Sequence, residues 1–428
     1  MAKSVVTITK NPDVEKMVDE GFALMGGVSS VIRPNSTVVL KPNAGHPYPP
    51  ETSVCTAPEL VAAAIRSIRK ANPKEIIVAE AAATSCDTDE CFDVSGIRKA
   101  AEEAGADKII DMKKEKDLIY VPIRNAVSDL KGVLLPKFLI EADHLVNMPV
   151  FKSHTCMIYT NCLKNIKGLV QDKVHREMHA TDLAQAMFDV WTVCNMDLQI
   201  ADMYRPAEGF GPHSTIPVDF GCVVMGRDPV AVDAVCCRMA GLDTNVVPYF
   251  KSAHARGLGN YNEKQIDVRG KSIAEVLRPM WFPFLKGLET WPEYNFITKG
   301  ACSTCLSLIA FSMDQLKQLG EYEKNAGIYI VAGPRKESDF PKGVDPKDII
   351  IVGNCAKKWA DKGIFSPGCP PNEGGVFRPI IERRNMEDIM NERMKTMGIG
   401  SRSAEQCASV SDPMVEYSRK MREQAAKK

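Results

Sequence analysis

The sequence lacks the features that would place the protein in a membrane or on nucleic acid. It contains no run of eighteen consecutive apolar residues, which is about the length that a membrane-spanning helix needs. The N-terminus, MAKSVVTITKNPDVEK, has no long apolar segment of the kind that signal peptides contain. Lysine plus arginine and aspartate plus glutamate both number 54, so no net charge favours nucleic acid or a lipid surface. We therefore expect a cytoplasmic protein that binds neither nucleic acid nor a membrane.

Cysteine, in contrast, is abundant. The chain has 14 cysteines in 428 residues, and without a secretory signal they indicate a reducing compartment with thiols that are free or bound to metal. The length suggests roughly two or three domains. A hydrophobic content of 45% and a charged content of 25% are ordinary for a globular chain.

A strand–helix–strand pattern near the N-terminus predicts the fold class. Residues 37–41 and 75–79 are short runs rich in β-branched residues, and each ends in polar residues or a turn. Between them, a helix is predicted to run from Pro58 to Ala71 with Thr56 as its N-cap. The pattern predicts an α/β fold with a mostly parallel sheet flanked by helices.

Polar residues follow these two strands at their carboxyl ends. Lys41 and Asn43 come after the first strand and Glu80 after the second. Open α/β sheets bind ligands at the carboxyl ends of their strands, so we predict that these residues bind substrate. The alternatives are a surface lysine for Lys41 and a capping carboxylate for Glu80.

The most distinctive stretch is residues 144–170, HLVNMPVFKSHTCMIYTNCLKNIKGLV. It begins as an apolar strand and then presents cations and an amide in quick succession. Such a set suits an anionic ligand, and a histidine can exchange protons near neutral pH. We predict Lys152, His154 and Lys164 as catalytic residues and Asn165 and Lys167 as binding residues. The alternative is a strand followed by a solvated basic turn.

Three acidic residues further along are also candidates for substrate binding. Glu208 opens the glycine-containing segment EGFGPHS, where the backbone has room to approach a ligand. Asp228 precedes Pro229 and is also the expected N-cap of a helix over 230–240. Asp233 lies inside that otherwise apolar helix, where a carboxylate needs a partner.

His175 and His179 have the i, i+4 spacing of two metal ligands on one face of a helix. The order HREMH lacks the HExxH arrangement of zinc proteases, so solvent-facing or phosphate-directed histidines are favoured over a metal site.

Together these segments resemble the signature blocks of DUF362, a widespread prokaryotic family known only as a domain of unknown function. The blocks are TVVLKPN at 37–43, VNMPVFKSHTCMIYTNCLKNIKG at 146–168, EGFGPH at 208–213 and GRDPVAVDAVCCRMAG at 226–241. They occur in the order of the family, and the resemblance covers about residues 1–275. It implies an α/β domain, usually from anaerobes, with iron–sulfur modules as frequent neighbours. It does not supply a reaction, and the compact ferredoxin cysteine run that many members carry is absent here.

Four dispersed cysteines follow instead. Cys302 and Cys305 form a CxxC at the start of a predicted helix, Cys355 follows a predicted strand, and Cys369 precedes two prolines. Four thiolates that converge from loops suit a [4Fe–4S] cluster, and a proline after the last ligand recurs in ferredoxins. Structural zinc and unliganded or redox-active thiols are the alternatives.

We expect three regions: a DUF362-like α/β domain at 1–275, a smaller cysteine-containing α/β domain at 276–398, and a helical tail at 399–428. Three functions fit these features. The first is an iron–sulfur redox protein that acts on an anionic small molecule or passes electrons to a redox partner protein. The second is a non-redox lyase or isomerase that acts on a hydroxy acid, with Lys152 or His154 as the base. The third is an activator or assembly module for another metalloenzyme.

Overall fold

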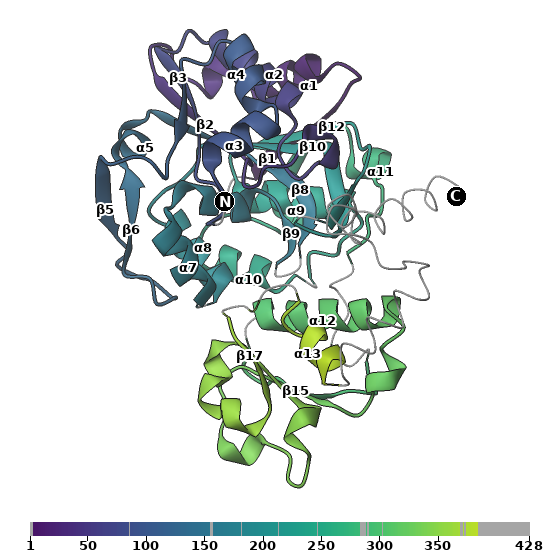
Figure 1. Ribbon diagram of the computed structural model, residues 1–428. Coiled ribbons are helices and arrows are strands. Elements are labelled where there is room, and N and C mark those ends of the chain that lie inside the picture. Colours follow the sequence, from purple (N-terminus) through teal and green to yellow (C-terminus); the bar gives the residue numbers. More distant parts are fainter. Residues whose placement is uncertain are drawn as a thin grey trace, which may run out of the picture. The chain divides into compact units, whose positions relative to one another are not determined.

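The structure, a computed structural model, describes most of the chain in two compact units (Figure 1). The first unit comprises residues 1–154 and 158–282, and the second comprises 155–157 and 283–428. Cys302, Cys369 and the helical tail expected at 399–428 lie outside the described residues. The described residues are 3–84, 86–154, 157–180, 182–212, 214–245, 247–282, 288, 291–301, 303–368, 371 and 374–383.

A large, mostly parallel sheet forms the centre of the first unit, which confirms the predicted α/β class. Its main path runs β13-β1-β12-β10-β7-β2-β3-β4, and the strands from β10 to β4 are parallel to one another. The eleven strands found among the described residues are β1 (Ser4–Lys10), β2 (Thr37–Pro42), β3 (Glu75–Glu80), β4 (Lys108–Asp111), β7 (His144–Met148), β8 (Val150–His154), β9 (Ile158–Thr160), β10 (Leu198–Phe210), β11 (Ser214–Pro217), β12 (Cys222–Gly226) and β13 (Ile266–Gly270).

Helices cover both faces of this sheet (Figure 1). Val38 and Leu40 of β2 point into a core shared with α1, α2 and α4. Because side chains alternate along a strand, Lys41 points to the opposite face, toward α6. The helices are α1 (Val14–Leu24), α2 (Pro58–Arg69), α3 (Thr88–Val94), α4 (Ile97–Glu103), α5 (Lys137–Glu141), α6 (Cys162–Asn165), α7 (Asp172–Ala180), α8 (Leu183–Trp191), α9 (Pro229–Met239), α10 (Pro248–Ala255) and α11 (Ile273–Val276). A separate hairpin pairs β5 (Leu118–Pro122) with β6 (Gly132–Pro136), and single turns lie at η1 (Val28–Ser30), η2 (Pro50–Thr52), η3 (Ile166–Leu169) and η4 (Glu263–Gln265).

The start of α2 differs from the prediction. Thr56 is not the N-cap, because its hydroxyl donates to the Met148 carbonyl at 2.7 Å and Ala57 occupies the cap position. The fully buried Asp202 carboxylate from β10 instead accepts the Ala57 N–H at 2.8 Å. A carboxylate from another strand therefore binds the N–H group of the cap residue itself, and the cap residue has no side-chain hydrogen bond to the first turn.

The second unit is built on a smaller sheet in which every strand pair is parallel. The strand order is β14-β15-β16-β17, so all four carboxyl ends lie at the same edge. Ile349 and Ile351 of β16 are buried with Val331 in its core. The elements are β14 (Asn295–Ile297), α12 (Ser303–Gln318), η7 (Glu323–Asn325), β15 (Tyr329–Ala332), η8 (Glu337–Asp339), η9 (Pro346–Asp348), β16 (Ile349–Val352), η10 (Asn354–Lys362), β17 (Ile364–Ser366) and α13 (Phe377–Glu382).

Within the described residues, no helix combines the length and the apolar character that crossing a bilayer requires.

Candidate functional site

A row of buried polar side chains crosses the sheet of the first unit. Lys41 of β2 and Gln199 of β10 both pair in register with Asn147 of β7. The Asn147 amide donates to Gln199 Oε1 at 2.7 Å, and its oxygen accepts from Asn165 Nδ2 at 2.8 Å. Asn165 Oδ1 in turn accepts from Lys41 Nζ at 3.0 Å. A chain of amides from three elements therefore ends at the Lys41 ammonium.

Lys41 and Glu80 form a fully buried ion pair at the carboxyl ends of β2 and β3. Lys41 Nζ lies 2.9 Å from Glu80 Oε2, and the side chains are 2% and 1% exposed. Burial lowers the pKa of Lys41 and raises the pKa of Glu80, and the pairing opposes both shifts. The backbone N–H groups of Ala44 and Ala81 also donate to the Glu80 carboxylate, at 3.0 Å each. The pair is thus closely enclosed by protein donors.

Gly168 closes over this ion pair. A Cβ at this position would overlap both the Glu80 carboxylate and the Lys41 ammonium. The Gly168 carbonyl also accepts the Ala81 N–H at 2.9 Å. Only a residue without a side chain fits here, which explains the glycine at the end of the basic stretch.

Lys152 is the second buried lysine of the site, and its surroundings differ from those of Lys41. Its Nζ donates to Asn43 Oδ1 at 3.0 Å and also to the Val54 carbonyl. Among the described residues no carboxylate lies within ion-pair distance of it, and it is 2% exposed. Burial lowers the pKa of Lys152 to about 8. Its amine therefore loses a proton far more readily than that of an exposed lysine.

Asn43 joins the two lysines into one network. Its oxygen accepts from Lys152, and its Nδ2 donates to Asn165 Oδ1 at 3.4 Å, the atom that also accepts from Lys41. The structure therefore brings together five of the residues predicted from the sequence: Lys41, Asn43, Glu80, Lys152 and Asn165.

Asp233 acts on this network through α6. Its fully buried carboxylate accepts the backbone N–H groups of Cys162 at 2.8 Å and Leu163 at 3.2 Å, and the Tyr159 hydroxyl at 3.0 Å. Burial raises the pKa of Asp233 to about 7, against the effect of these donors. The expected partner of this carboxylate is thus the start of the helix that carries Asn165.

Lys164 and Lys167 flank Asn165 in α6 and η3, and both are half-buried. His154 is buried at the end of β8, opposite Ile158 of β9 in the register. These three residues lie on the elements that adjoin the network.

The remaining two candidates are engaged by protein groups elsewhere. Asp228 is the N-cap of α9, as expected, and it also accepts the Ser4 hydroxyl at 2.6 Å and the Asn260 N–H at 2.8 Å. Glu208 accepts the Trp281 N–H at 2.8 Å.

Cys55 is a residue of the site that the sequence does not single out. Its buried thiol donates to the His46 carbonyl at 3.2 Å. Burial raises its pKa, and the nearby Lys152 charge opposes that shift. A lone cysteine in a turn carries no local signal of this neighbourhood.

His175, proposed above as solvent-facing or phosphate-directed, is buried. Its Nε2 lies 2.5 Å from the Lys167 carbonyl. Burial and the Lys167 charge lower its pKa to about 3, so the ring is neutral. It supports the backbone of the basic segment as a hydrogen-bond donor.

The second unit gathers three of the segments that carry the predicted metal ligands. Cys305 is buried in α12, and a Cβ on Gly353 would lie 3.2 Å from its Sγ. Asn354 donates its N–H to the Gly368 carbonyl at 2.9 Å and accepts the Gly368 N–H at 3.0 Å. Cys355 is the exposed residue after Asn354, and Gly368 directly precedes Cys369 in the sequence. The described residues contain no group of three potential metal-ligating side chains.

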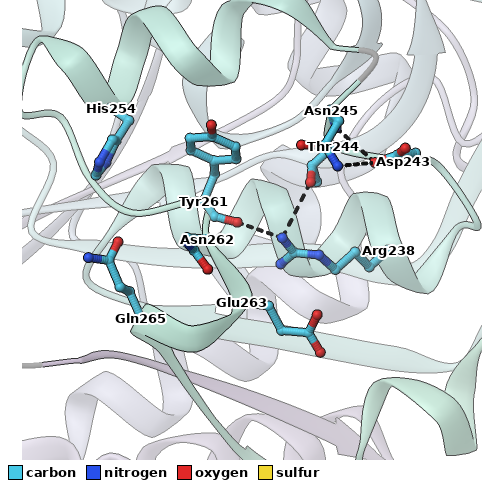
Figure 2. A pocket seen from close by; sticks show the side chains of 9 residues that line it. All are labelled: Arg238, Asp243, Thr244, Asn245, His254, Tyr261, Asn262, Glu263 and Gln265. Atoms are coloured by element: carbon cyan, nitrogen blue, oxygen red, sulfur yellow. Dashed lines mark hydrogen bonds between the residues drawn. The ribbon is translucent and has the colours of Figure 1, made fainter.

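A polar pocket of about 510 Å³ lies in another part of the first unit, at the C-terminal end of α9 (Figure 2). Arg238 donates to the Tyr261 carbonyl at 2.5 Å and to the Thr244 hydroxyl at 3.3 Å. None of the predicted site residues lines this pocket. Its lining residues are Arg238, Asp243, Thr244, Asn245, His254, Tyr261, Asn262, Glu263 and Gln265.

Comparisons with known proteins bear on the first unit above all. Residues 38–238 match the family model described as domain of unknown function (DUF362), which confirms the predicted resemblance over that range. A thylakoid-associated protein of Synechocystis sp. is 24% identical over 293 residues, which cover 64% of this chain and 87% of that protein.

Two solved structures are loosely similar. The lactate racemase apoprotein from Thermoanaerobacterium thermosaccharolyticum is 11% identical with a TM-score of 0.37, and the match covers 90% of this chain and 91% of that one. A Thermotoga maritima protein is 11% identical with a TM-score of 0.34, and the match covers 84% of this chain and 93% of that one. Scores at this level carry neither a substrate nor a cofactor over to this chain.

Proposed function

We propose that the protein is an iron–sulfur redox protein that acts on an anionic small molecule or a partner protein. In this proposal Cys302, Cys305, Cys355 and Cys369 hold a [4Fe–4S] cluster in the second unit, and the polar network of the first unit binds the anion. When bound, such a cluster exchanges single electrons.

One observation carries the metal part of the proposal: the contacts among Cys305, Gly353 and the Asn354–Gly368 pair. Because the four strands of the second sheet are parallel, the segments after β16 and β17 emerge at one edge. Gly353 has a φ of 85°, and with no Cβ it leaves space beside the Cys305 thiol. The donor set is sulfur, which suits iron–sulfur clusters and also zinc.

The anion part rests on charge and position. Among the described residues Lys152 donates to neutral oxygens only, and Lys164 and Lys167 lie within two positions of Asn165, an amide of the same network. A buried cation without a carboxylate partner favours the binding of an anion.

Metal analysis of anaerobically purified protein tests the proposal. We expect iron and acid-labile sulfide in equal amounts, visible absorption, and a paramagnetic resonance signal after reduction. Cys355→Ser should lower the iron content, whereas Cys86→Ser, which changes a cysteine outside the set, should leave it unchanged. Colourless protein that holds one zinc ion would refute the iron–sulfur assignment.

A second candidate is a non-redox lyase or isomerase that acts on a hydroxy acid. Lys152 favours it, because an amine with a pKa of about 8 is suited to take up and release a proton near neutral pH. This function predicts exchange of the proton at C2 of a hydroxy acid with deuterated solvent, followed by NMR, without any electron donor. Loss of that exchange in Lys152→Ala, with the metal content unchanged, would favour this candidate over the redox protein.

A further inference from the structure

The two buried lysines of the first unit are equally shielded but have different partners. Lys41 and Lys152 are each 2% exposed. Lys41 is paired with the Glu80 carboxylate at 2.9 Å, and this pairing opposes the lowering of its pKa by burial. Within the part of the chain that the structure describes, Lys152 donates hydrogen bonds only to the neutral oxygens of Asn43 and Val54. The two amines are therefore equally buried, but only that of Lys41 has a carboxylate partner among the described residues.

We propose that Lys152 is a nucleophile that forms an imine with the carbonyl group of a small 2-oxo carboxylate. This inference rests on the anion site of the proposed function and deepens it by naming the class of substrate. A desolvated lysine without a counter-ion is the usual form of a lysine that reacts with carbonyl compounds.

The reaction needs no oxidant or reductant. Lys152 Nζ attacks the carbonyl carbon, so that a C–N bond forms while the C=O π bond becomes a C–O single bond. The C–O bond then breaks and a C=N bond takes its place. The carbonyl oxygen leaves as one water molecule with the two protons of the neutral amine.

The surroundings of Lys152 suit this substrate class. Asn43, which accepts from the amine, is only half-buried, so one hydrogen bond separates the amine from a residue that reaches the surface. Asn43 also contacts Asn165 of α6, and the half-buried cations Lys164 and Lys167 lie on α6 and on η3, which follows it. The hydrogen-bond network of the amine therefore includes an element that carries positive charge, which suits a carbonyl compound with a carboxylate.

The pKa of Lys152, about 8, sets the expected size of the effect. At pH 7 an amine with this pKa is neutral about 10²-fold more often than an exposed lysine amine at its ordinary pKa of 10.5. Only the neutral form attacks carbonyl carbon, so Lys152 should react first at low concentrations of a carbonyl probe.

Reductive trapping tests the inference on the full-length protein. The protein is treated with pyruvate and cyanoborohydride at pH 7, digested, and analysed by mass spectrometry. We expect one carboxyethyl group, on Lys152. Two lysines in the same sample serve as controls: Lys41, which is equally buried but ion-paired, and Lys70, which is exposed and paired with Asp19. A label spread over exposed lysines, with Lys152 unmodified, would overturn the inference.

A neutral carbonyl compound tests the requirement for a carboxylate. The ratio of pyruvate labelling to acetone labelling should be at least about tenfold higher at Lys152 than at the exposed Lys70, which corrects for the different reactivity of the two carbonyl groups; this is the step expected for one charge-assisted contact. Equal ratios at the two lysines would refute the assignment to 2-oxo carboxylates.

The same preparation separates this inference from the proposed redox function, because trapping needs no electron donor. Labelled Lys152 in protein without iron would leave the inference standing and remove the redox function. Unlabelled Lys152 in protein with a full complement of iron and sulfide would refute the inference and leave the redox function standing.

Discussion

The Asp233 carboxylate of α9 accepts the backbone N–H of Cys162 at 2.8 Å, which fixes the start of α6 from another element. The Asp233 carboxylate also accepts the N–H of Leu163. Asn165 lies two residues after Leu163 in the same short helix and accepts a hydrogen bond from Lys41 Nζ. A helix of four residues has little stability of its own, so its position depends on such outside contacts. Asp233 is therefore a positioning residue for the polar network, with no exposed surface of its own.

Asp233 should make the stability of the first unit fall as pH rises toward neutrality. Burial raises its pKa from 3.8 to about 7, so between these values the folded state holds a proton that the unfolded state has lost. Its contribution is full below about pH 4 and is lost as pH rises through about 7. The stability difference between the wild type and Asp233→Asn should therefore shrink over this window, by at most about 1.4 kcal/mol per pH unit. Hydrogen exchange in increasing urea, read on peptides of the first unit, measures it. A pH-independent difference would contradict the prediction.

Removal of Glu80 should destabilise the first unit strongly. Glu80→Gln leaves the Lys41 charge buried without its partner, which typically costs about 3–5 kcal/mol. The double variant Lys41→Met with Glu80→Leu removes both charges and should lose less than Glu80→Gln alone. The same urea experiment measures both. Asp19→Asn, which breaks the exposed pair with Lys70, is the matched control and should cost no more than about 1 kcal/mol.

The α/β class and the first parallel strands could be predicted because their signals are local. The run TVVLK at 37–41 is apolar and β-branched, and it becomes β2 with one face in the core. The contacts at the start of α2 could not be predicted in this way. Asp202, which accepts the N–H of the cap residue Ala57, lies 145 positions away from it in the sequence, so only the folded chain brings them together.

The candidate site shows the same division. Lys41 and Glu80 are identifiable because each follows an apolar run near the end of a strand, and Lys152 because it follows an apolar run, although the structure places it in the middle of β8. The hydrogen-bond partners of the two lysines could not be predicted, because Asn165 and Asn43 are distant in sequence from the lysines that they contact. The sequence does not single out Asn147, since one amide inside an apolar strand has no pattern of its own.

An alanine at position 168 should disrupt the Lys41–Glu80 pair. Its Cβ would overlap both charged groups, and forced overpacking of this kind costs about 1–3 kcal/mol. We expect this cost to appear as a lower free energy of unfolding of the first unit in urea. Gly45→Ala is the control, because a Cβ there would lie 3.7 Å from Asn43 Nδ2, an ordinary contact. Equal stability of the two variants would contradict the prediction, because it would mean that the backbone around position 168 can shift to accommodate a Cβ without loss of stability.

A methyl group at position 353 should interfere with metal binding in the second unit. Gly353→Ala places a Cβ 3.2 Å from the Cys305 thiol and also strains a backbone with a φ of 85°. Gly327→Ala, in the same unit, has a φ of 88° and no atom within 4 Å of its Cβ, so it reproduces the strain without the contact. Both variants should lose about 1 kcal/mol of stability. Only Gly353→Ala should lower the iron bound per chain after anaerobic purification. Equal iron contents in the two variants would mean that the space beside Cys305 has no part in holding metal.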